Sequence, residues 1–100
     1  MTVSKGLIVR LEAKQGQEEA VASFLRSAVP LVDEEPATIA WFAFQTAASS
    51  FAIVDVFPDE DGRRAHLAGA VAAALEEHGP ELLAQPPQIE TVDALATKLP

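Results

Sequence analysis

Two neighbouring segments of the chain are predicted to form strands that are apolar on both faces. Residues 38–46 and 51–57 are rich in β-branched and aromatic side chains and are joined by a short polar turn, which predicts a β-hairpin. In the first strand Trp41 and Phe42 point opposite ways, and the second strand has the same pattern. A half-solvated antiparallel sheet would alternate apolar and polar residues. Both faces of this sheet are therefore expected to be covered.

The rest of the chain supplies two more strands and two helices. Alternation predicts a strand over residues 6–13, and residues 88–98 predict the last one. The first helix has its apolar stripe at Val21, Phe24, Leu25, Ala28, Val29 and Val32, and Pro30 is expected to kink it or end it near Val29. Residues 33–36 then predict a solvated acidic turn.

The second helix follows the hairpin. Asp59 or Asp61 is its expected N-cap, and His78-Gly79-Pro80 is expected to close it, with residues 81–84 adding at most one turn. Its predicted core stripe consists of Leu67, Ala70, Val71, Ala74 and Leu75.

The resulting order, β-α-β-β-α-β, predicts an α+β ferredoxin-like domain over residues 1–100. Its antiparallel sheet would carry two helices on one face. The other face is too hydrophobic to remain in water, so a second copy is expected to cover it. The sequence therefore predicts a homodimer in which two sheets pack together as a barrel.

The charge and composition exclude several classes of partner. The formal net charge is -8, which disfavours nucleic acids and anionic membranes. There is no cysteine, which excludes disulfides and thiolate chemistry and is compatible with the cytoplasm. Neither a signal peptide nor an apolar run long enough to span a membrane is expected. The two histidines have no metal-ligand spacing, so no metal site is predicted.

Several stretches resemble the antibiotic biosynthesis monooxygenase (ABM) family across nearly the whole chain. They are residues 6–16 (GLIVRLEAKQG), 34–38 (EEPAT), 51–57 (FAIVDVF) and 64–69 (RAHLAG). The resemblance implies a dimeric α/β-barrel in which each subunit has a pocket between its helices and sheet. It also implies, for several members, oxidation of aromatic or quinol-type substrates with dioxygen and without metal or flavin.

The chain departs from the family pattern at two places. Haem-degrading members carry Asn, Trp and His at positions that match Val9, Phe57 and His66, so only the histidine is kept and haem degradation is not expected. A Ser-Pro-His motif usual after that histidine is Gly69-Ala70-Val71 here, so a second active-site histidine is not expected either.

Two residues are candidates for catalysis. His66 lies at the edge of the apolar helix stripe, and its pKa near neutrality suits it to take a proton from a phenol or hydroquinone. Its alternative role is that of a boundary histidine bonded to backbone or water. Asp55 lies inside an apolar strand and would share the face of Phe57, with His66, Arg63 or Arg64 as its partner. Its alternative role is a structural carboxylate bonded to Arg10 or to a partner chain.

The expected pocket lining is Trp41, Phe57, Val9 and Leu67, with the aromatic pair as a stacking wall. Arg10 and Glu12 share the opposite strand face and are expected to form a pair at the dimer interface. His78 is expected at a helix C-terminus, where the helix dipole favours it.

Three functions remain open. The first is a cofactor-independent monooxygenase acting on an aromatic or quinol-type molecule, with His66 as base and Asp55 as its aid. The second is a non-catalytic dimer of the same fold that is structural or binds a small apolar ligand. The third is isomerisation or dehydration of a cyclic compound, which also needs only a base. The sequence does not identify the substrate.

Overall fold

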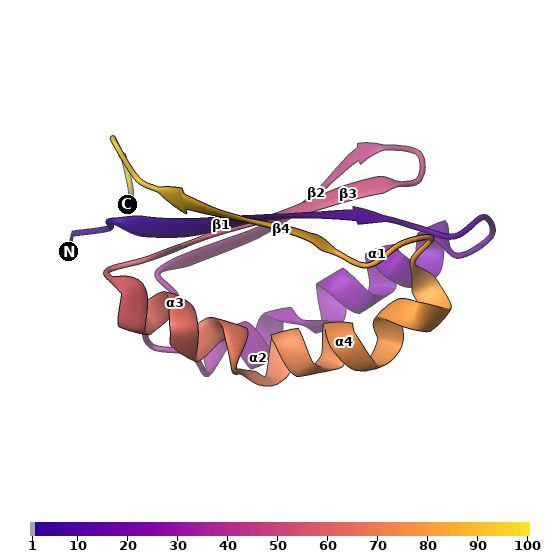
Figure 1. The fold of residues 1–100 in the computed structure, drawn as a ribbon, viewed down its shortest axis with the longest axis horizontal. Coiled ribbons are helices and arrows are strands. Elements are labelled where there is room, and N and C mark those ends of the chain that lie inside the picture. The colour runs from indigo at the N-terminus through magenta and orange to yellow at the C-terminus, as the bar shows by residue number, and fades with distance from the viewer. Residues whose placement is uncertain (1) are drawn as a thin grey trace.

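The computed structural model describes residues 2–100, and within them four strands and four helices follow one another (Figure 1). Their order and bounds are β1 (Lys5–Glu12), α1 (Glu18–Ser27), α2 (Val29–Asp33), β2 (Ala40–Ala47), β3 (Ser50–Phe57), α3 (Glu60–Leu67), α4 (Ala70–Leu82) and β4 (Gln88–Asp93).

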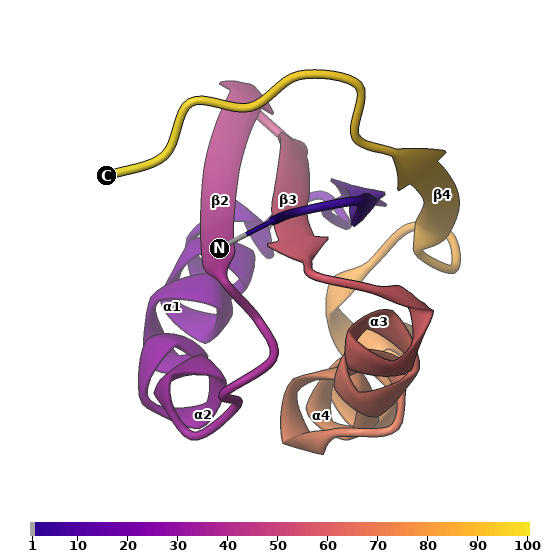
Figure 2. The ribbon, with the colours of Figure 1, turned by 90° about the vertical axis from the view of Figure 1, so that its left-hand side faces the viewer.

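The strands form one antiparallel sheet in the order β2-β3-β1-β4. All helices in the described part of the chain lie on one face of it, with α1 and α2 below β2 and with α3 and α4 below the β4 side (Figure 2). This arrangement confirms the predicted α+β ferredoxin-like fold. β4 ends at Asp93 rather than at residue 98, because Asp93 pairs with Lys5, the first residue of β1, and β1 offers no partner beyond it.

Each predicted helix is divided in two. As expected from Pro30, α1 ends at Ser27, and Pro30 occupies the first turn of the short helix α2. None of the helices in residues 2–100 has the length and apolarity needed to cross a membrane.

The second helix differs more from the prediction. It stops at Leu67 and restarts at Ala70, because Gly69 has an extended backbone with φ of -90° and ψ of -174°. The expected stop at Gly79-Pro80 is wrong, since Pro80 lies inside α4. The last turn is held by packing rather than by propensity, because Leu83, directly after α4, is buried in the core and bridges to Ala13.

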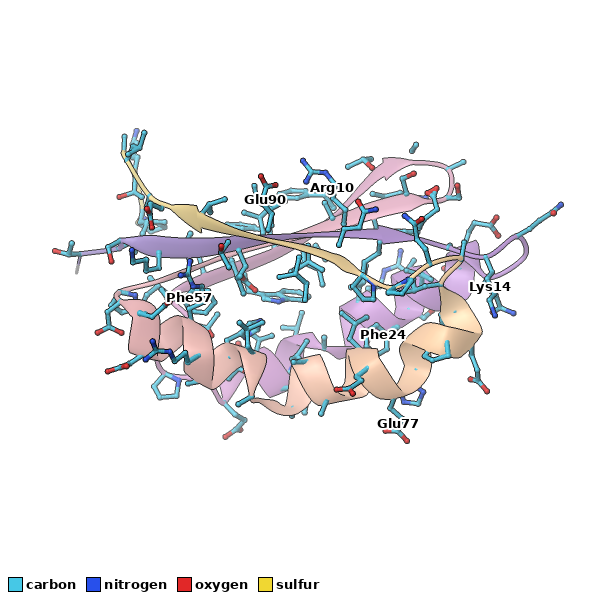
Figure 3. The ribbon with its side chains drawn as sticks, in the orientation of Figure 1. Arg10, Lys14, Phe24, Phe57, Glu77 and Glu90 are labelled. Atoms are coloured by element: carbon cyan, nitrogen blue, oxygen red, sulfur yellow. The ribbon has the colours of Figure 1, made fainter. Side chains whose placement is uncertain are left out.

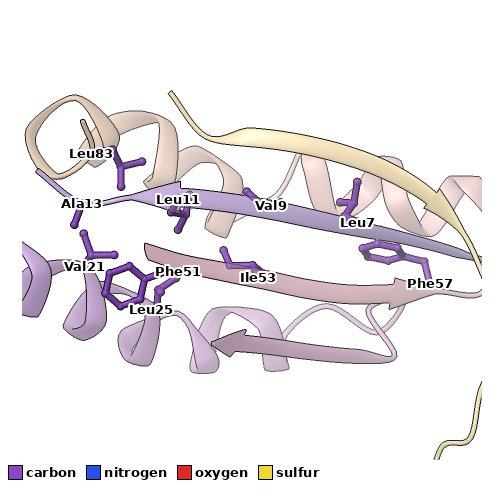
Figure 4. Packing of buried hydrophobic residues seen from close by; sticks show 10 residues of the cluster. All are labelled: Leu7, Val9, Leu11, Ala13, Val21, Leu25, Phe51, Ile53, Phe57 and Leu83. Atoms are coloured by element: carbon purple, nitrogen blue, oxygen red, sulfur yellow. The ribbon is translucent and has the colours of Figure 1, made fainter. Parts of the chain in front are cut away.

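The core lies between the helices and the sheet (Figure 4). Its fully buried members from the sheet include Leu7 and Phe57, and α1 contributes Val21 and Leu25. The register places alternate residues of β1 and β3 toward the helices, so Val9 lies opposite Ile53 and Leu7 opposite Asp55.

The other sheet face carries no helix. Arg10 and Glu90 point outward from it (Figure 3), with 3.4 Å between the Arg10 guanidinium and the Glu90 carboxylate. Two aromatic rings, Phe42 and Phe44, also lie on this face, each 50% exposed and stacked with centroids 5.8 Å apart. The face is therefore mixed, with its apolar part on β2 and the neighbouring strand β3.

Candidate functional site

Asp55 is a buried carboxylate in the middle of the sheet. The alternation of β3 turns it toward the helices together with Ile53 and Phe57, as the sequence predicts, and only 1% of its surface is exposed. Its neighbours across the sheet are Leu7 and Trp41. An ionised carboxylate in such surroundings requires a close partner.

His66 is that partner. It occupies the last turn of α3 and is 6% exposed, with its ring 5.4 Å from the ring of Phe57. Its Nε2 atom lies 3.0 Å from Oδ2 of Asp55. His66 is therefore buried rather than bonded to water at a boundary, and it contacts Asp55 directly, a point that the sequence left open.

Glu35 completes the group, and the sequence reasoning missed it. Its Oε1 atom lies 2.6 Å from His66 Nδ1 and accepts a hydrogen bond of 2.8 Å from the Thr38 hydroxyl. The prediction of a solvated acidic turn is wrong at this position, since the Glu35 side chain is only 17% exposed. The predicted hairpin could have indicated the contact between Glu35 and His66. Because β2 begins where its antiparallel neighbour β3 ends, the segment before β2 meets the helix after β3.

The two carboxylates determine the protonation of His66. Burial by itself lowers the pKa of the imidazole, but the hydrogen bonds and negative charges of Asp55 and Glu35 outweigh it, so the pKa of His66 is raised above its ordinary 6.5. The C-terminal end of α3 favours the same positive charge. The two carboxylates thus favour the imidazolium form of the ring.

Asp55 retains unused hydrogen-bonding capacity. Within the described residues, Oδ1 is buried without any hydrogen-bond partner, and Oδ2 has only the close contact with His66, which is not a well-aligned hydrogen bond. Buried carboxylate oxygens are normally paired. Oδ1 therefore still needs a hydrogen-bond donor, and Asp55 is one of the residues that line a neighbouring cavity.

A cavity of about 280 Å³ lies beside Asp55, between α3, α4 and the sheet. At its inner end are Leu7, Val9, Ile53, Asp55 and His66, all buried. Exposed residues from α3, α4 and β4 form its rim, among them Leu67, Glu76 and Ile89. The remaining lining residues are apolar: Val71, Ala72, Leu75 and Pro87.

The predicted lining residues divide into two pairs. Val9 and Leu67 line this cavity, but Leu67 is 40% exposed rather than part of the core stripe, because the break at Gly69 rotates α3 independently of α4. Phe57 is fully buried in the core and Trp41 borders other hollows, so neither forms the expected aromatic wall. The cavity wall is aliphatic.

The remaining charged candidates have structural partners. Arg63 is not the partner of Asp55; it pairs with Glu60 at 2.6 Å and donates to the Gly6 and Val92 carbonyl oxygens. The expected pair between Arg10 and Glu12 is wrong. Glu12 accepts hydrogen bonds from Ser49 and Ser50, while Arg10 pairs with Glu90 as described above.

The second histidine lies away from this group. His78 lies within α4 rather than at its end and contacts the ring of Phe24 edge-on, at a centroid distance of 6.0 Å. Among residues 2–100, no three His, Cys, Asp or Glu side chains form a group that could hold a metal ion.

Comparisons with known proteins agree with the fold. No family model and no curated protein matches the chain. Among solved structures, NE2512 of Nitrosomonas europaea, a protein of unknown function, is 52% identical, with a TM-score of 0.97 over 99% of this chain and 96% of that one.

Two more distant structures carry the name expected from the sequence. A "putative antibiotic biosynthesis monooxygenase" from Nitrosomonas europaea is 18% identical, with a TM-score of 0.82 over 95% of this chain and 93% of that one. A protein of the same description from Chloroflexus aurantiacus is also 18% identical, with a TM-score of 0.74 over 95% of this chain and 96% of that one. At this identity the likeness is one of fold.

Proposed function

Because the chain belongs to the same family as NE2512 and has the fold of the proteins described as antibiotic biosynthesis monooxygenases, we propose that it is a cofactor-independent monooxygenase. Its substrate would be an aromatic or quinol-type small molecule and its oxidant dioxygen. One observation carries the proposal: a buried carboxylate and histidine stand together at the inner end of an apolar cavity.

For this reaction the protein must supply a proton acceptor and an apolar cavity. The acidic O–H or C–H bond of the substrate breaks, its proton goes to the Asp55–His66 pair, and the electron pair remains on the substrate. The resulting anion gives one electron to dioxygen, and the two radicals combine to a peroxide. The peroxide anion takes the proton back from the pair, and the C–H and O–O bonds of the hydroperoxide then break. With a CH₂ group at the reacting carbon, the product is C=O and the second oxygen atom leaves as water. The apolar cavity keeps bulk water away from the anion.

Oxygen uptake with a panel of hydroquinones and anthrones tests this proposal. We expect turnover with at least one member and a product whose oxygen comes from labelled dioxygen. His66→Gln should lower kcat at least about a hundredfold, because it removes one half of the pair that accepts the proton and stabilises the new anion. His78→Gln removes the other histidine, which lies outside the cavity, and should retain full turnover. Full turnover by His66→Gln would reject the assigned mechanism.

A second candidate is binding without chemistry. It is favoured by the aliphatic cavity wall, which offers no aromatic surface for stacking a flat substrate. In that case the protein would retain a small apolar molecule and consume no oxygen. Isomerisation in the same cavity would leave the product mass equal to that of the substrate, and dehydration would lower it by one water. Only oxygenation adds an oxygen atom, so product mass distinguishes the three reactions.

We also propose that the protein works as a homodimer whose sheets pack face to face. The support is the helix-free sheet face, where Phe42 and Phe44 are half exposed beside partly exposed Val54 and Val56 of β3. Monomeric proteins rarely leave such contiguous apolar surface in water. A second copy with the same patch would cover it.

A further inference from the structure

The cavity has an unusual balance of charge. Its polar lining consists of Asp55, His66 and Glu76, and no lysine or arginine lines it. The single cation, His66, is already shared between Asp55 and Glu35. A bound anion would face the two lining carboxylates without a cation of its own, so the cavity disfavours negatively charged ligands.

His66 has no ring nitrogen left for a ligand. Nδ1 contacts Glu35 and Nε2 contacts Asp55, and with both nitrogens protonated the ring can only donate hydrogen bonds. Asp55 Oδ1, in contrast, is fully buried, unpartnered and part of a residue that lines the cavity. A ligand that donates an O–H or N–H to this atom would satisfy it.

We infer that Asp55, not His66, receives the hydrogen bond and then the proton of the ligand, and that Glu35 is the positioning residue that makes this possible. The inference deepens the proposed function and rests on the same cavity. By pairing with Nδ1, Glu35 favours the protonated form of His66, and the positive charge of that ring then lies 3.0 Å from the Asp55 carboxylate. The ligand is thereby restricted to molecules that carry a hydrogen-bond donor and no negative charge.

The proton balance fits this division of roles. The ligand O–H bond breaks, the proton joins Asp55 Oδ1, and the electron pair stays on the ligand oxygen. His66 remains an imidazolium throughout and supplies the positive charge next to the new anion, while Glu35 remains ionised. The titratable groups in contact with His66 are Asp55 from β3 and Glu35 from the segment before β2, and Glu76 of α4 lies at the cavity rim.

A binding experiment without turnover tests the ligand class. Three bicyclic probes of similar shape are compared by titration calorimetry: 2-naphthol, 2-methoxynaphthalene and 2-naphthoate. We expect 2-naphthol to bind about tenfold more tightly than the methoxy compound, the effect of one hydrogen bond to a charged group, and 2-naphthoate to bind most weakly. Equal affinity for the naphthoate, or no binding of 2-naphthol, would overturn the inference.

Two variants test the roles of the carboxylates. Asp55→Asn should remove most of the preference for 2-naphthol over its methoxy analogue. Glu35→Gln should shift the titration of the His66 ring, followed by nuclear magnetic resonance, to lower pH and reduce the same preference. Glu34→Gln is the matched control, because it removes one charge from the neighbouring exposed residue and should change neither.

The outcomes separate this inference from the proposed function. If the probes bind as expected but no oxygen is consumed with any substrate, the roles of Asp55 and Glu35 stand and the monooxygenase proposal fails. If oxygen is consumed while Glu35→Gln leaves the His66 titration unchanged, the positioning role is wrong. Should Asp55→Asn not fold, the comparison of the three probes on the wild-type protein still decides the ligand class.

Discussion

At the scale of single residues, the feature that most distinguishes this molecule is a cation enclosed by two anions. His66 has Asp55 on one side and Glu35 on the other, and all three are largely removed from water. Such a group is stabilising only while its charges remain complementary, because an unmatched buried charge is costly. Protonation of the histidine is therefore part of the stability of the fold as well as of its proposed chemistry.

The stability of the protein should fall with pH in alkaline solution. The folded-state pKa of His66 is raised above 6.5, so folding favours the protonated ring. This contribution is fully present below the unfolded-state pKa and is lost as pH rises through the folded-state pKa. Urea unfolding from about pH 6 upward should show a gap between the wild type and His66→Gln that narrows with pH. A gap independent of pH would contradict the assignment; His78→Gln serves as the reference.

At the scale of elements, the joint between α3 and α4 matters most. Gly69 lies against Glu35, and a Cβ atom built on it would stand 2.8 Å from Glu35 Oε2 and 3.2 Å from the carbonyl oxygen of His66. The backbone angles at this position suit any residue, so space and not conformation requires glycine. The joint thus keeps room for the Glu35 carboxylate beside His66.

Two alanine substitutions of glycine should therefore differ in their effects. Gly69→Ala should displace Glu35, lower the pKa of His66 and destabilise the fold by about 1–2 kcal/mol. Gly79→Ala, inside α4, meets no atom closer than 3.7 Å apart from its chain neighbours, and should leave the pKa of His66 unchanged; for stability, the gain in helix propensity is opposed by the restriction that Pro80 places on the residue before it. Denaturant midpoints and the His66 resonance titration check both values. Stabilisation by Gly69→Ala would show that Glu35 does not need this space.

The sequence determines strands better than helices in this chain. A strand has a period of two, so the alternation placed Asp55 on the same face as Ile53 and Phe57, and the family resemblance placed that face toward the helices. A helical wheel, by contrast, assumes one uninterrupted helix, and the break at Gly69 invalidated it for Leu67 and His66. The role of Glu35 was missed for another reason. Its contact with His66 joins residues 31 positions apart, and it becomes visible only when the pairing of β2 with β3 is followed to the segments beyond the two strands.

At the scale of the whole molecule, all helices of residues 2–100 lie on one side of the sheet, and no helix of these residues covers the other side. Dimerisation in solution is therefore expected, with a particle of twice 10.6 kDa by light scattering at micromolar concentration. Replacing Phe42 and Phe44 together with glutamate should give monomers, because like charges would then meet across the interface. A wild-type protein that is already a 10.6 kDa monomer would contradict this expectation.

A control variant distinguishes the sheet face from surface charge in general. Leu31→Glu places the same charge on a helix, at a residue that is 39% exposed. This variant should remain dimeric. Its dissociation would indicate that the helix side, and not the open sheet face, forms the contact.

The segment before β4 sets a limit on what the cavity can admit. Pro87 lines the cavity and follows Pro86, and these two prolines lie between Ala84, whose N–H is bonded to the Glu12 carbonyl, and Gln88, the first residue of β4. Proline fixes its own φ and restricts the residue before it, so this short span is stiff. The opening of the cavity cannot widen through a rearrangement of the span from Ala84 to Gln88. Affinity should therefore fall abruptly once a substituent makes the ligand wider than the opening of the cavity.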